Sequence, residues 1–251
     1  MFELINKIFF SIKDDGFKIF LKKIKIFLIM KKKKELKKKI FQIKCIEDKF
    51  TKIYDNNYWS DKESRSGEGS NLIAAKQSIN HIPKIIKKFK IRNIFDAPCG
   101  DFNWMQLIIY KKNLKYIGAD IVKTLIKELN KKYSTNLIKF KHINIIKQKL
   151  PNADLMICRD CLFHFSNKDI KLFFFNLKKS KIKYILTTSH FIQPKMKPNK
   201  NISTGDFRKI DIFSYPFKFK KKSVLYYFKD FKKNSNNQSY MFLFKIDDIV
   251  I

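Results

Sequence analysis

The feature that most constrains the fold is the alternation of short apolar segments with helix-like segments from residue 91 onward. Five apolar runs have the length of strands, namely NIFDA, KYIGAD, LIKFKHINI, ADLMIC and KYILTTS. Three helix-like runs lie among them, namely FNWMQLIIY, VKTLIKELNKKY and KDIKLFFFNLKK. Strands that alternate with helices of this length imply βαβ units. The sequence therefore predicts an α/β fold with a mostly parallel sheet, and VLYYFKD and SYMFLFKI are predicted to form a C-terminal antiparallel strand pair.

The segments that precede this alternation differ in composition. Residues 1–50 are rich in Lys, Ile and Phe, lack proline and contain the block KKKKELKKK, which indicates one or two basic helices. Residues 54–71 are polar and rich in Gly and Ser, which is typical of a loop, and residues 72–90 are helix-like with Pro83 near a turn. We therefore expect a basic helical extension over residues 1–50 and one domain over residues 51–251.

The charge is strongly positive. The 251 residues contain 55 Lys and Arg against 22 Asp and Glu, a formal net charge of +33, which ordinarily points to nucleic acid or anionic lipid. Only four of these cations are arginines, however, and base-reading surfaces favour the planar guanidinium group. Lys, Ile, Asn and Phe, which have A/T-rich codons, are abundant together. Either a phosphate-rich partner or the base composition of the gene explains the excess charge.

The rare residue types are informative against this lysine-rich background. Arg, Gly, Trp and Pro are expected where no substitute works, because each has a geometry that other residues lack. They gather in four places, at Arg65, Gly67 and Gly69, at Pro98, Gly100 and Trp104, at Arg159, and at Gly205 and Arg208. We expect the functional chemistry in these four places.

The cysteines and the lack of long apolar runs indicate the compartment. Cys45, Cys99, Cys158 and Cys161 are too sparse for the disulfide framework of a secreted protein, so we expect a reducing environment. No signal-peptide pattern is visible, and no run approaches the ~18 apolar residues of a membrane-spanning helix. Zinc at Cys158 and Cys161 would need a second ligand pair, which the sequence does not supply. These patterns predict a cytoplasmic protein without a metal site.

DAPCGDFNW (residues 96–104) lies between a predicted strand and a helix, where an α/β sheet binds nucleotide-like ligands. It lacks the G-x-G-x-x-G series, which disfavours a nicotinamide or flavin dinucleotide. Asp120 ends the next strand 24 residues after Asp96, near the ~20-residue spacing at which an acidic residue binds ribose. Asn144 and CRDCLFHF (158–165) follow two further strands. The strand ends thus direct polar residues to one cleft, and an ordinary strand-to-helix turn is the alternative at residues 96–104.

Together these segments resemble the class I S-adenosylmethionine-dependent methyltransferases over residues 54–250, with DAPCGDFNW in place of the first motif and Asp120 in place of the acidic second. YWS…SRSGEGS, PCGDFNW, IGADIV, CRDCLFHF and TGDFR are similar in combination to a bacterial group associated with surface-glycan biosynthesis. Pro98 and Phe102 stand where the general motif has glycine, and Asn144 stands where an aspartate often holds the adenine amine. The resemblance implies a Rossmann-like methyltransferase fold and S-adenosylmethionine as cofactor.

The resemblance also implies roles for individual residues. Asp96 and the backbone of residues 99–101 would orient the methionine part, Asp120 the ribose, and Asn144 with Ile145 the adenine. The cofactor-binding residues implied in this way are Asp96, Cys99, Gly100, Asp101, Asp120, Ile121, Asn144 and Ile145.

Asp160 and His164 are the candidate catalytic residues. Methyl transfer is an in-line displacement whose rate can come from proximity, and a base is needed only for a protonated acceptor. Both residues follow the fourth strand, and their spacing places them on one face if a helical turn follows. His190 is a third candidate. The alternative for His164, which lies between two phenylalanines, is simple packing.

The acceptor is expected to be a small molecule or a glycan intermediate. Arg65, Arg159, Asp206 and Arg208 are candidates for binding it, because guanidinium groups suit a carboxylate or phosphate on a sugar or nucleotide-linked substrate. Salt bridges that order the two long loops are the alternative. Two other functions stay open, an RNA methyltransferase and a non-catalytic lysine-rich binding protein on a methyltransferase scaffold.

Helical periodicity in the extension suggests a membrane contact. Phe17, Phe20, Leu21, Ile24, Phe27 and Leu28 recur at helical spacing opposite several lysines. Such an amphipathic helix, followed by the lysine block, can bind peripherally to anionic lipid on the inner face of a membrane. Packing of the helix on the catalytic domain is the alternative.

Overall fold

The computed structural model describes residues 17–111, 113–191, 199–232 and 238–249. The chain divides into two compact units, residues 1–44 and residues 45–251. The described part of the first unit is a single helix, and the second unit contains the sheet and the remaining helices.

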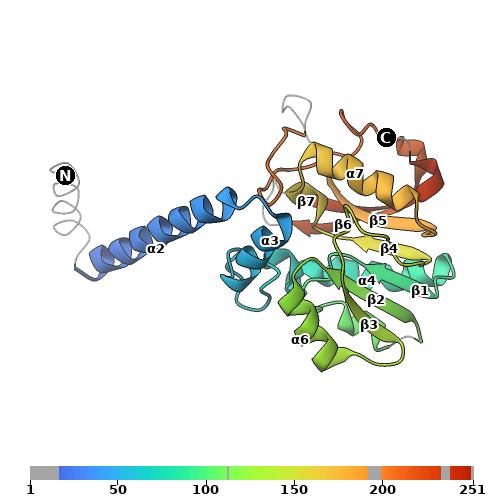
Figure 1. The fold of residues 1–251 in the computed structure, drawn as a ribbon, viewed down its shortest axis with the longest axis horizontal. Helices are drawn as coiled ribbons and strands as arrows, with labels where there is room; N and C mark the ends of the chain where they lie inside the picture. Colours follow the sequence, from blue (N-terminus) through green and yellow to red (C-terminus); the bar gives the residue numbers. More distant parts are fainter. Residues whose placement is uncertain (1–16, 112, 192–198, 233–237, 250–251) are drawn as a thin grey trace. The chain divides into compact units, whose positions relative to one another are not determined.

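Seven strands form one mixed sheet in the second unit, in the order β3-β2-β1-β4-β5-β7-β6 (Figure 1). Their bounds are Asn93–Asp96 for β1, Lys115–Asp120 for β2, Ile138–His142 for β3, Leu155–Cys158 for β4, Tyr184–His190 for β5, Val224–Lys232 for β6 and Gln238–Lys245 for β7. Strands β1 to β5 are parallel, and β7 runs antiparallel to both β5 and β6. The predicted fold class, with its C-terminal antiparallel pair, is therefore confirmed.

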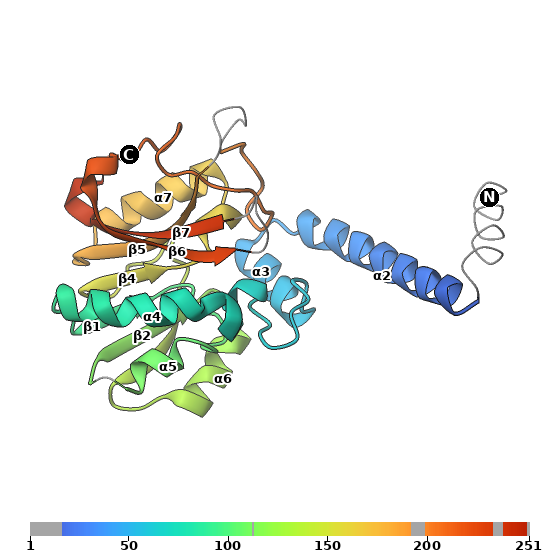
Figure 2. The ribbon, with the colours of Figure 1, turned by 180° about the vertical axis from the view of Figure 1, so that it is seen from behind.

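Helices cover both faces of this sheet. Their bounds are Ile46–Asp55 for α3, Leu72–Lys88 for α4, Gln106–Ile109 for α5, Lys123–Tyr133 for α6 and Asn167–Lys178 for α7. Figure 1 shows α7 in front of the sheet, and Figure 2 shows α4 and α5 in front of the opposite face. Successive strand residues point to opposite faces, so Ile94 packs in the cluster with α4, α5 and α6, and Phe95 packs in the cluster with α7. Burial on both sides explains why the parallel strands read as nearly continuous apolar runs.

Two helices differ from the sequence prediction. The helix expected over FNWMQLIIY is reduced to α5, because Phe102 takes a left-handed backbone conformation (φ 60°) and residues 101–105 form turns. Helix α4 continues through Pro83, which was expected near a turn. Its Asn71 side chain caps the first turn, and Ile82, Ile85 and Ile86 are buried, which offsets the hydrogen bond lost at the proline.

The sheet-containing unit begins at Cys45, six residues before the expected domain start. Helix α3 is part of this unit because Ile53 and Tyr54 are buried in it. Lys49 is also buried, and its Nζ donates a hydrogen bond to the carbonyl oxygen of Thr204 at 2.9 Å. Residues 45–50, which composition alone assigned to the extension, therefore help to build the core.

The described part of the first unit is helix α2, Phe17–Gln42. It agrees with the predicted basic helix, and residues 1–16 of the extension lie outside the described residues. Throughout the described ranges, no helix combines the length and the apolar character that crossing a bilayer requires.

Candidate active site

A cavity of about 440 Å³ lies at the carboxyl edge of the parallel strands. The residues at or just after the ends of β1, β2, β3, β4 and β5 all line it, as Asp96, Asp120, Ile143, Arg159 and His190 show. Its size falls within the range of small-molecule sites, which is roughly 300–1,000 Å³. The strand ends therefore meet at one site, as the sequence predicts.

Asp120 presents a buried carboxylate to this cavity. The residue is 8 % exposed, and its two oxygens accept hydrogen bonds from the backbone N–H groups of Gly100 (3.3 Å) and Val122 (3.0 Å). Burial raises the pKa of Asp120 to about 6, although these hydrogen bonds oppose the rise. A carboxylate has about four lone-pair sites, so Asp120 can accept further hydrogen bonds from a ligand with hydroxyl groups.

Asp96 is a second buried carboxylate at the same cavity. It is 2 % exposed and accepts a hydrogen bond from the hydroxyl group of Tyr116 at 2.7 Å. Burial raises its pKa to about 7, the Tyr116 hydrogen bond lowers it, and the Asp120 charge raises it. The charge of Arg159 also lowers the pKa of Asp96, but burial outweighs it, so a positively charged ligand would favour the ionised form of both carboxylates.

The loop after β1 contacts a second loop, residues 64–70, which precedes the sheet in the sequence. Gly100 has φ +53°, and a Cβ atom there would lie 2.5 Å from Ser66 Oγ, so only glycine fits. Ser66 Oγ accepts a hydrogen bond from the backbone N–H of Asp101 at 2.9 Å. The Asp101 carboxylate accepts from the Ser64 hydroxyl at 2.8 and 3.0 Å. These contacts hold the loop of residues 64–70 in place, and residues 66–70 of this loop form one wall of the cavity.

The third strand contributes a largely apolar slot. Ile143, Asn144, Ile145 and Ile146, which follow β3, line the cavity. The Asn144 side chain is partly engaged, because its Oδ1 accepts a hydrogen bond from the backbone N–H of Ile146 at 3.0 Å. Apolar walls with one amide suit a flat heteroaromatic ring.

Arg159 connects the cavity to the protein interior. Its Nε donates to Asp230 Oδ2 at 2.7 Å, and its Nη1 donates to the Gly69 carbonyl oxygen at 2.6 Å. The same Nη1 lies 3.4 Å from Asp160 Oδ2. The guanidinium carbon also lies 5.3 Å from the ring centre of Trp104. Arg159 therefore holds the 64–70 loop and Asp160 in place.

Asp160 and His164 both line the cavity, but no regular helical turn joins them. Asp160 has a left-handed backbone (φ 51°), and residues 162–164 form a 3₁₀ turn. Asp160 Oδ1 accepts a hydrogen bond from Thr188 Oγ1 at 3.2 Å. His164 Nδ1 lies 2.8 Å from the carbonyl oxygen of Asp206, which can only accept, so Nδ1 carries the proton.

The two histidines of the cavity are held neutral. Burial lowers the pKa of both His164 and His190, and nearby carboxylates and backbone carbonyls oppose this effect. In a neutral His164 that donates from Nδ1, Nε2 is a proton acceptor. The ring is held between aromatic side chains, with centroids 5.4 Å from Trp59, 4.6 Å from Phe163 and 6.0 Å from Phe207. These rings form an aromatic wall beside the imidazole.

Ten of the fourteen predicted site residues line the cavity. They are Asp96, Cys99, Gly100, Asp120, Ile121, Asn144, Ile145, Arg159, Asp160 and His164. Arg65, Asp101, Asp206 and Arg208 do not line it. Asp101 instead anchors the 64–70 loop, and the exposed Arg65 places its guanidinium carbon 5.9 Å from the Tyr54 ring centre.

Arg208 has a structural role in place of the expected acceptor contact. Its Nη1 donates to the carbonyl oxygens of Leu162 (3.4 Å) and Phe163 (3.2 Å), and its Nη2 donates to Asn167 Oδ1 (2.9 Å). Burial lowers its pKa to about 10. Since the Asp206 carbonyl orients His164, the TGDFR segment supports the 162–164 turn, and Phe207 is its residue at the cavity.

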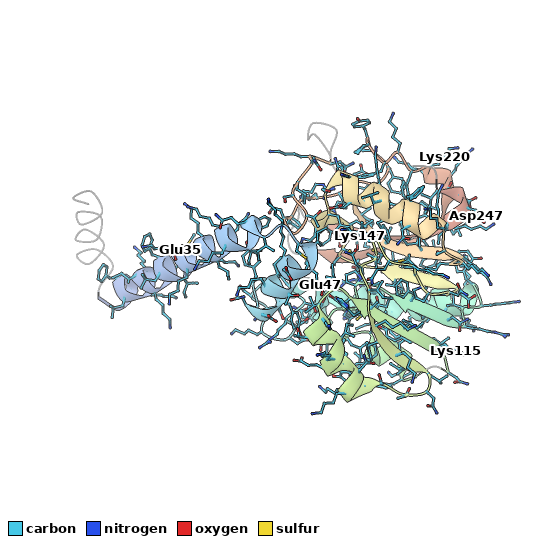
Figure 3. All side chains as sticks on the ribbon, viewed as in Figure 1. Glu35, Glu47, Lys115, Lys147, Lys220 and Asp247 are labelled. Atoms are coloured by element: carbon cyan, nitrogen blue, oxygen red, sulfur yellow. The ribbon has the colours of Figure 1, made fainter. Side chains whose placement is uncertain are left out.

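The cavity lining is acidic, whereas the chain as a whole is strongly basic. Its lining includes Glu68, Asp96, Asp120 and Asp160 against the single cation Arg159. Lysine supplies 51 of the 55 Lys and Arg residues, yet within the described ranges none lines the cavity. Lysines such as Lys115, Lys147 and Lys220 are exposed on the outer surface (Figure 3). An acidic cavity suits a cationic ligand and disfavours a phosphate-rich one.

Sequence reasoning missed several residues of the site. Asp230 on β6 is the buried partner of Arg159 and also accepts a hydrogen bond from the Ser78 hydroxyl at 2.7 Å. Strand periodicity could have indicated its burial, because Tyr226, Phe228 and Asp230 lie at every second position and therefore on one face of the strand. Trp59 lies in the YWS segment that the resemblance includes, but its position beside His164 depends on long-range contacts.

No group of three or more His, Cys, Asp or Glu side chains suited to a metal occurs in the described ranges.

Sequence comparisons do not show a family. No family model matches the chain. A stretch of 97 residues is 31% identical to the enolase of Pelagibacter ubique strain HTCC1062, which amounts to 36% of this chain and 23% of that protein. The chain thus spans about a quarter of the length of this curated relative.

Solved structures give the fold. The chain is similar to the 1,6-didemethyltoxoflavin-N1-methyltransferase of Burkholderia thailandensis, solved with 1,6-didemethyltoxoflavin and S-adenosylhomocysteine, with a TM-score of 0.57, 10% identity, and coverage of 79% of this chain and 86% of that one. It is also similar to magnesium protoporphyrin IX methyltransferase from Synechocystis PCC 6803 with bound S-adenosylhomocysteine, with a TM-score of 0.53, 12% identity, and coverage of 79% and 96%. At these identities the likeness shows the fold, which is the Rossmann-like fold of methyltransferases.

Proposed function

We propose that this chain is an S-adenosylmethionine-dependent methyltransferase that acts on a small, uncharged acceptor. The observation that carries the proposal is the pair of buried carboxylates, Asp96 and Asp120, at the carboxyl edge of a methyltransferase fold. S-adenosylmethionine carries a sulfonium and an ammonium charge together with ribose hydroxyls. It therefore offers the cation and the hydrogen-bond donors that these two carboxylates favour.

The lining residues fit the parts of this cofactor. Asp96 and the loop of residues 99–101 would hold the methionine part, and Asp120 would accept hydrogen bonds from the ribose. Ile143, Ile145 and Asn144 would contact the adenine ring. When bound, the cofactor supplies an electrophilic methyl group, so the protein has to align the acceptor with it and exclude water.

The acceptor side is supported by the aromatic wall and the hydrogen-bonding groups beside it. Trp59, Phe163 and Phe207 offer flat apolar surfaces, and Asp160 and His164 Nε2 can accept hydrogen bonds from an acceptor hydroxyl or amine. His164 Nε2 can also take the acceptor proton as the methyl group is transferred, because its ring is kept neutral and orientated by the Asp206 carbonyl.

Within the small-molecule class we propose a glycan intermediate. The apolar face of a sugar ring packs on aromatic side chains, and its hydroxyl groups donate to carboxylates. The sequence resemblance to methyltransferases of surface-glycan biosynthesis supports the same choice. The absence of lysine from the described cavity lining argues against an RNA acceptor entering this site. The intact pair Asp96 and Asp120 argues against a degenerate, non-catalytic scaffold.

Calorimetry tests the cofactor assignment. We expect S-adenosylmethionine and S-adenosylhomocysteine to bind the purified chain, and Asp120→Ala to weaken binding by roughly 5- to 150-fold, because the ribose donors lose their acceptor at about 1–3 kcal/mol. Lys115→Ala, a change at an exposed residue far from the cavity lining, is the matched control. A folded Asp120→Ala variant with unchanged affinity would remove the basis of the proposal.

Transfer of a labelled methyl group to an acceptor library tests the acceptor class. The library should contain neutral saccharides, lipid-linked saccharides, phosphorylated sugars and transfer RNA. We expect label on a neutral saccharide, because the acidic cavity lining disfavours phosphate groups. Label on RNA that depends on Asp120 would retain the methyltransferase and overturn the acceptor class.

A further inference from the structure

Helix α2 exposes an unusual concentration of large apolar side chains. Seven of the nineteen exposed large apolar residues in the described chain lie within twelve consecutive positions. They are Ile19, Leu21, Ile26, Phe27, Leu28, Ile29 and Met30, and each is between 48 and 66 % exposed. Single exposed apolar residues are ordinary, but a contiguous group of this size marks an interaction surface.

The charges of the same helix are almost all positive. Helix α2 contains eleven lysines and one acidic residue, Glu35 (Figure 3). No acidic residue occurs between Phe17 and Lys34, and Lys31, Lys32 and Lys34 are exposed directly after the apolar group. The surface therefore combines apolar side chains with a dense positive charge, which complements a surface that is both apolar and anionic.

The two halves of α2 carry their apolar residues on different sides of the helix. In the first half, Phe20, Leu21, Ile24, Phe27 and Leu28 share one side at 3.6 residues per turn. In the second half, the apolar residues Leu36 and Ile40 lie on the opposite side, and Ile40 is fully buried. The exposed apolar surface is thus confined to residues 19–30, next to the lysines that begin at residue 31.

We propose that residues 17–34 of α2 attach the protein peripherally to an anionic lipid surface. The exposed side chains of Leu21, Phe27 and Leu28, which share one side of the helix, enter the boundary between headgroups and acyl chains, and the lysines contact lipid phosphates. Lys22, Lys23 and Lys25 interrupt the apolar run, and their long side chains can reach the headgroup layer. This attachment is independent of the proposed methyl transfer.

Lipid explains the surface better than nucleic acid does. Polyanion binding would use the lysines but would leave Ile26, Phe27, Leu28, Ile29 and Met30 exposed to water. The segment contains no arginine and no tryptophan or tyrosine, which are the residues that stack best on bases. The apolar group needs an apolar partner, and the lysines need an anionic one.

Flotation of the purified full chain with vesicles tests the attachment. The vesicles contain phosphatidylcholine alone or phosphatidylcholine mixed with phosphatidylglycerol. We expect binding to the mixed vesicles that falls as salt is added, and weak binding to the neutral ones. Either binding to neither vesicle or equal binding to both at every salt concentration would overturn the proposal.

Two variants separate the apolar and the ionic contributions. Phe27→Ser with Leu28→Ser removes two apolar contacts, and Lys31→Gln, Lys32→Gln and Lys34→Gln together remove three charges. We expect each to lower the vesicle partition coefficient by roughly 10- to 100-fold. Lys220→Gln, Lys221→Gln and Lys222→Gln together form the matched control, since these exposed lysines remove the same charge elsewhere and are expected to change binding less than about threefold.

The remaining outcomes are decisive as well. An equal loss in the two triple lysine variants would assign the binding to net charge and overturn the role of α2. Circular dichroism checks that each variant keeps its helix content. If Phe27→Ser with Leu28→Ser loses it, Phe27→Gln with Leu28→Gln takes its place. Binding of a single-stranded RNA that depends on Lys31, Lys32 and Lys34, without binding to vesicles, would replace lipid by nucleic acid as the partner.

Discussion

Arg159 Nε and Asp230 Oδ2 lie 2.7 Å apart with both side chains almost completely buried. The pair joins β4 and β6, which are not adjacent in the sheet, and it reaches the cavity through the contacts of Arg159 with Gly69 and Asp160. Burial raises the pKa of Asp230 and the charge of Arg159 lowers it. A buried ion pair stabilises little by itself, but losing one partner leaves an unpaired buried charge. The pair therefore makes the positions of the 64–70 loop and Asp160 depend on the core.

Asp230→Ala should lower both stability and turnover. We expect a loss of about 3–5 kcal/mol in the free energy of unfolding, because Arg159 is left buried without its carboxylate. Urea denaturation measures this loss. Asp247→Ala is the control, since its ion pair with Lys245 is exposed and screened by solvent and should contribute little to stability. Equal effects of the two substitutions would show that the Arg159 pair does not support the site.

In their ionised form, the two buried carboxylates should destabilise the free folded protein and stabilise its complex with a cationic ligand. The folded pKa values of Asp96 (about 7) and Asp120 (about 6) exceed the ordinary value of 3.8. Between about pH 4 and pH 7 the folded chain thus binds more protons than the unfolded chain, so stability falls as pH rises. Asp120→Asn should therefore raise the melting temperature of the free protein at pH 8, by the equivalent of about 1–3 kcal/mol, while weakening cofactor binding. A lower melting temperature would contradict this sign.

Cofactor affinity should also depend on pH. A cationic ligand binds the ionised carboxylates best, so the affinity for S-adenosylmethionine should fall as pH decreases from 8 through about 7 and 6, the folded pKa values of Asp96 and Asp120. Calorimetry at several pH values measures the change. Asp96→Asn with Asp120→Asn should bind weakly with little pH dependence, and a variant that keeps the wild-type pH profile would assign the titration to another group.

His164→Gln should separate catalysis from binding. Once an acceptor is known, we expect kcat to fall by roughly 10²–10⁴ while the Kd of the cofactor stays unchanged, because a general base acts in the transition state. His81→Gln is the control, since His81 stacks on Phe228 away from the cavity lining. Retention of the full kcat would indicate that His190 acts as the base or that the acceptor needs none.

The sequence could predict the sheet and the residues at the strand ends because both follow from local pattern. The carboxyl ends of parallel strands meet at one edge, so Asp96 and Asp120 were predictable once β1 and β2 were recognised. The segment with Gly67 and Gly69 was expected to be functional, but its place beside the cavity was not predictable, because that place depends on hydrogen bonds to Asp101 and Arg159 across the chain. Arg208 was assigned to the acceptor because a guanidinium group suits a carboxylate or phosphate, whereas its partners are two backbone carbonyls and the Asn167 side chain, which no sequence pattern displays.

Gly69→Ala tests whether the 64–70 loop and the carboxylate of Asp160, a proposed acceptor-binding residue, must lie this close together. A Cβ atom at Gly69 would overlap the Asp160 carboxylate, so the loop or the carboxylate has to move. A displacement of about 1 Å at a reacting group can cost roughly 10²-fold in rate, and we expect a loss of that order in kcat/KM. Lys62→Ala, an exposed position of the same loop segment, is the control and should keep full activity. If Gly69→Ala also retains full activity with an unchanged melting temperature, Asp160 does not need its present position, and His164 alone would serve the acceptor.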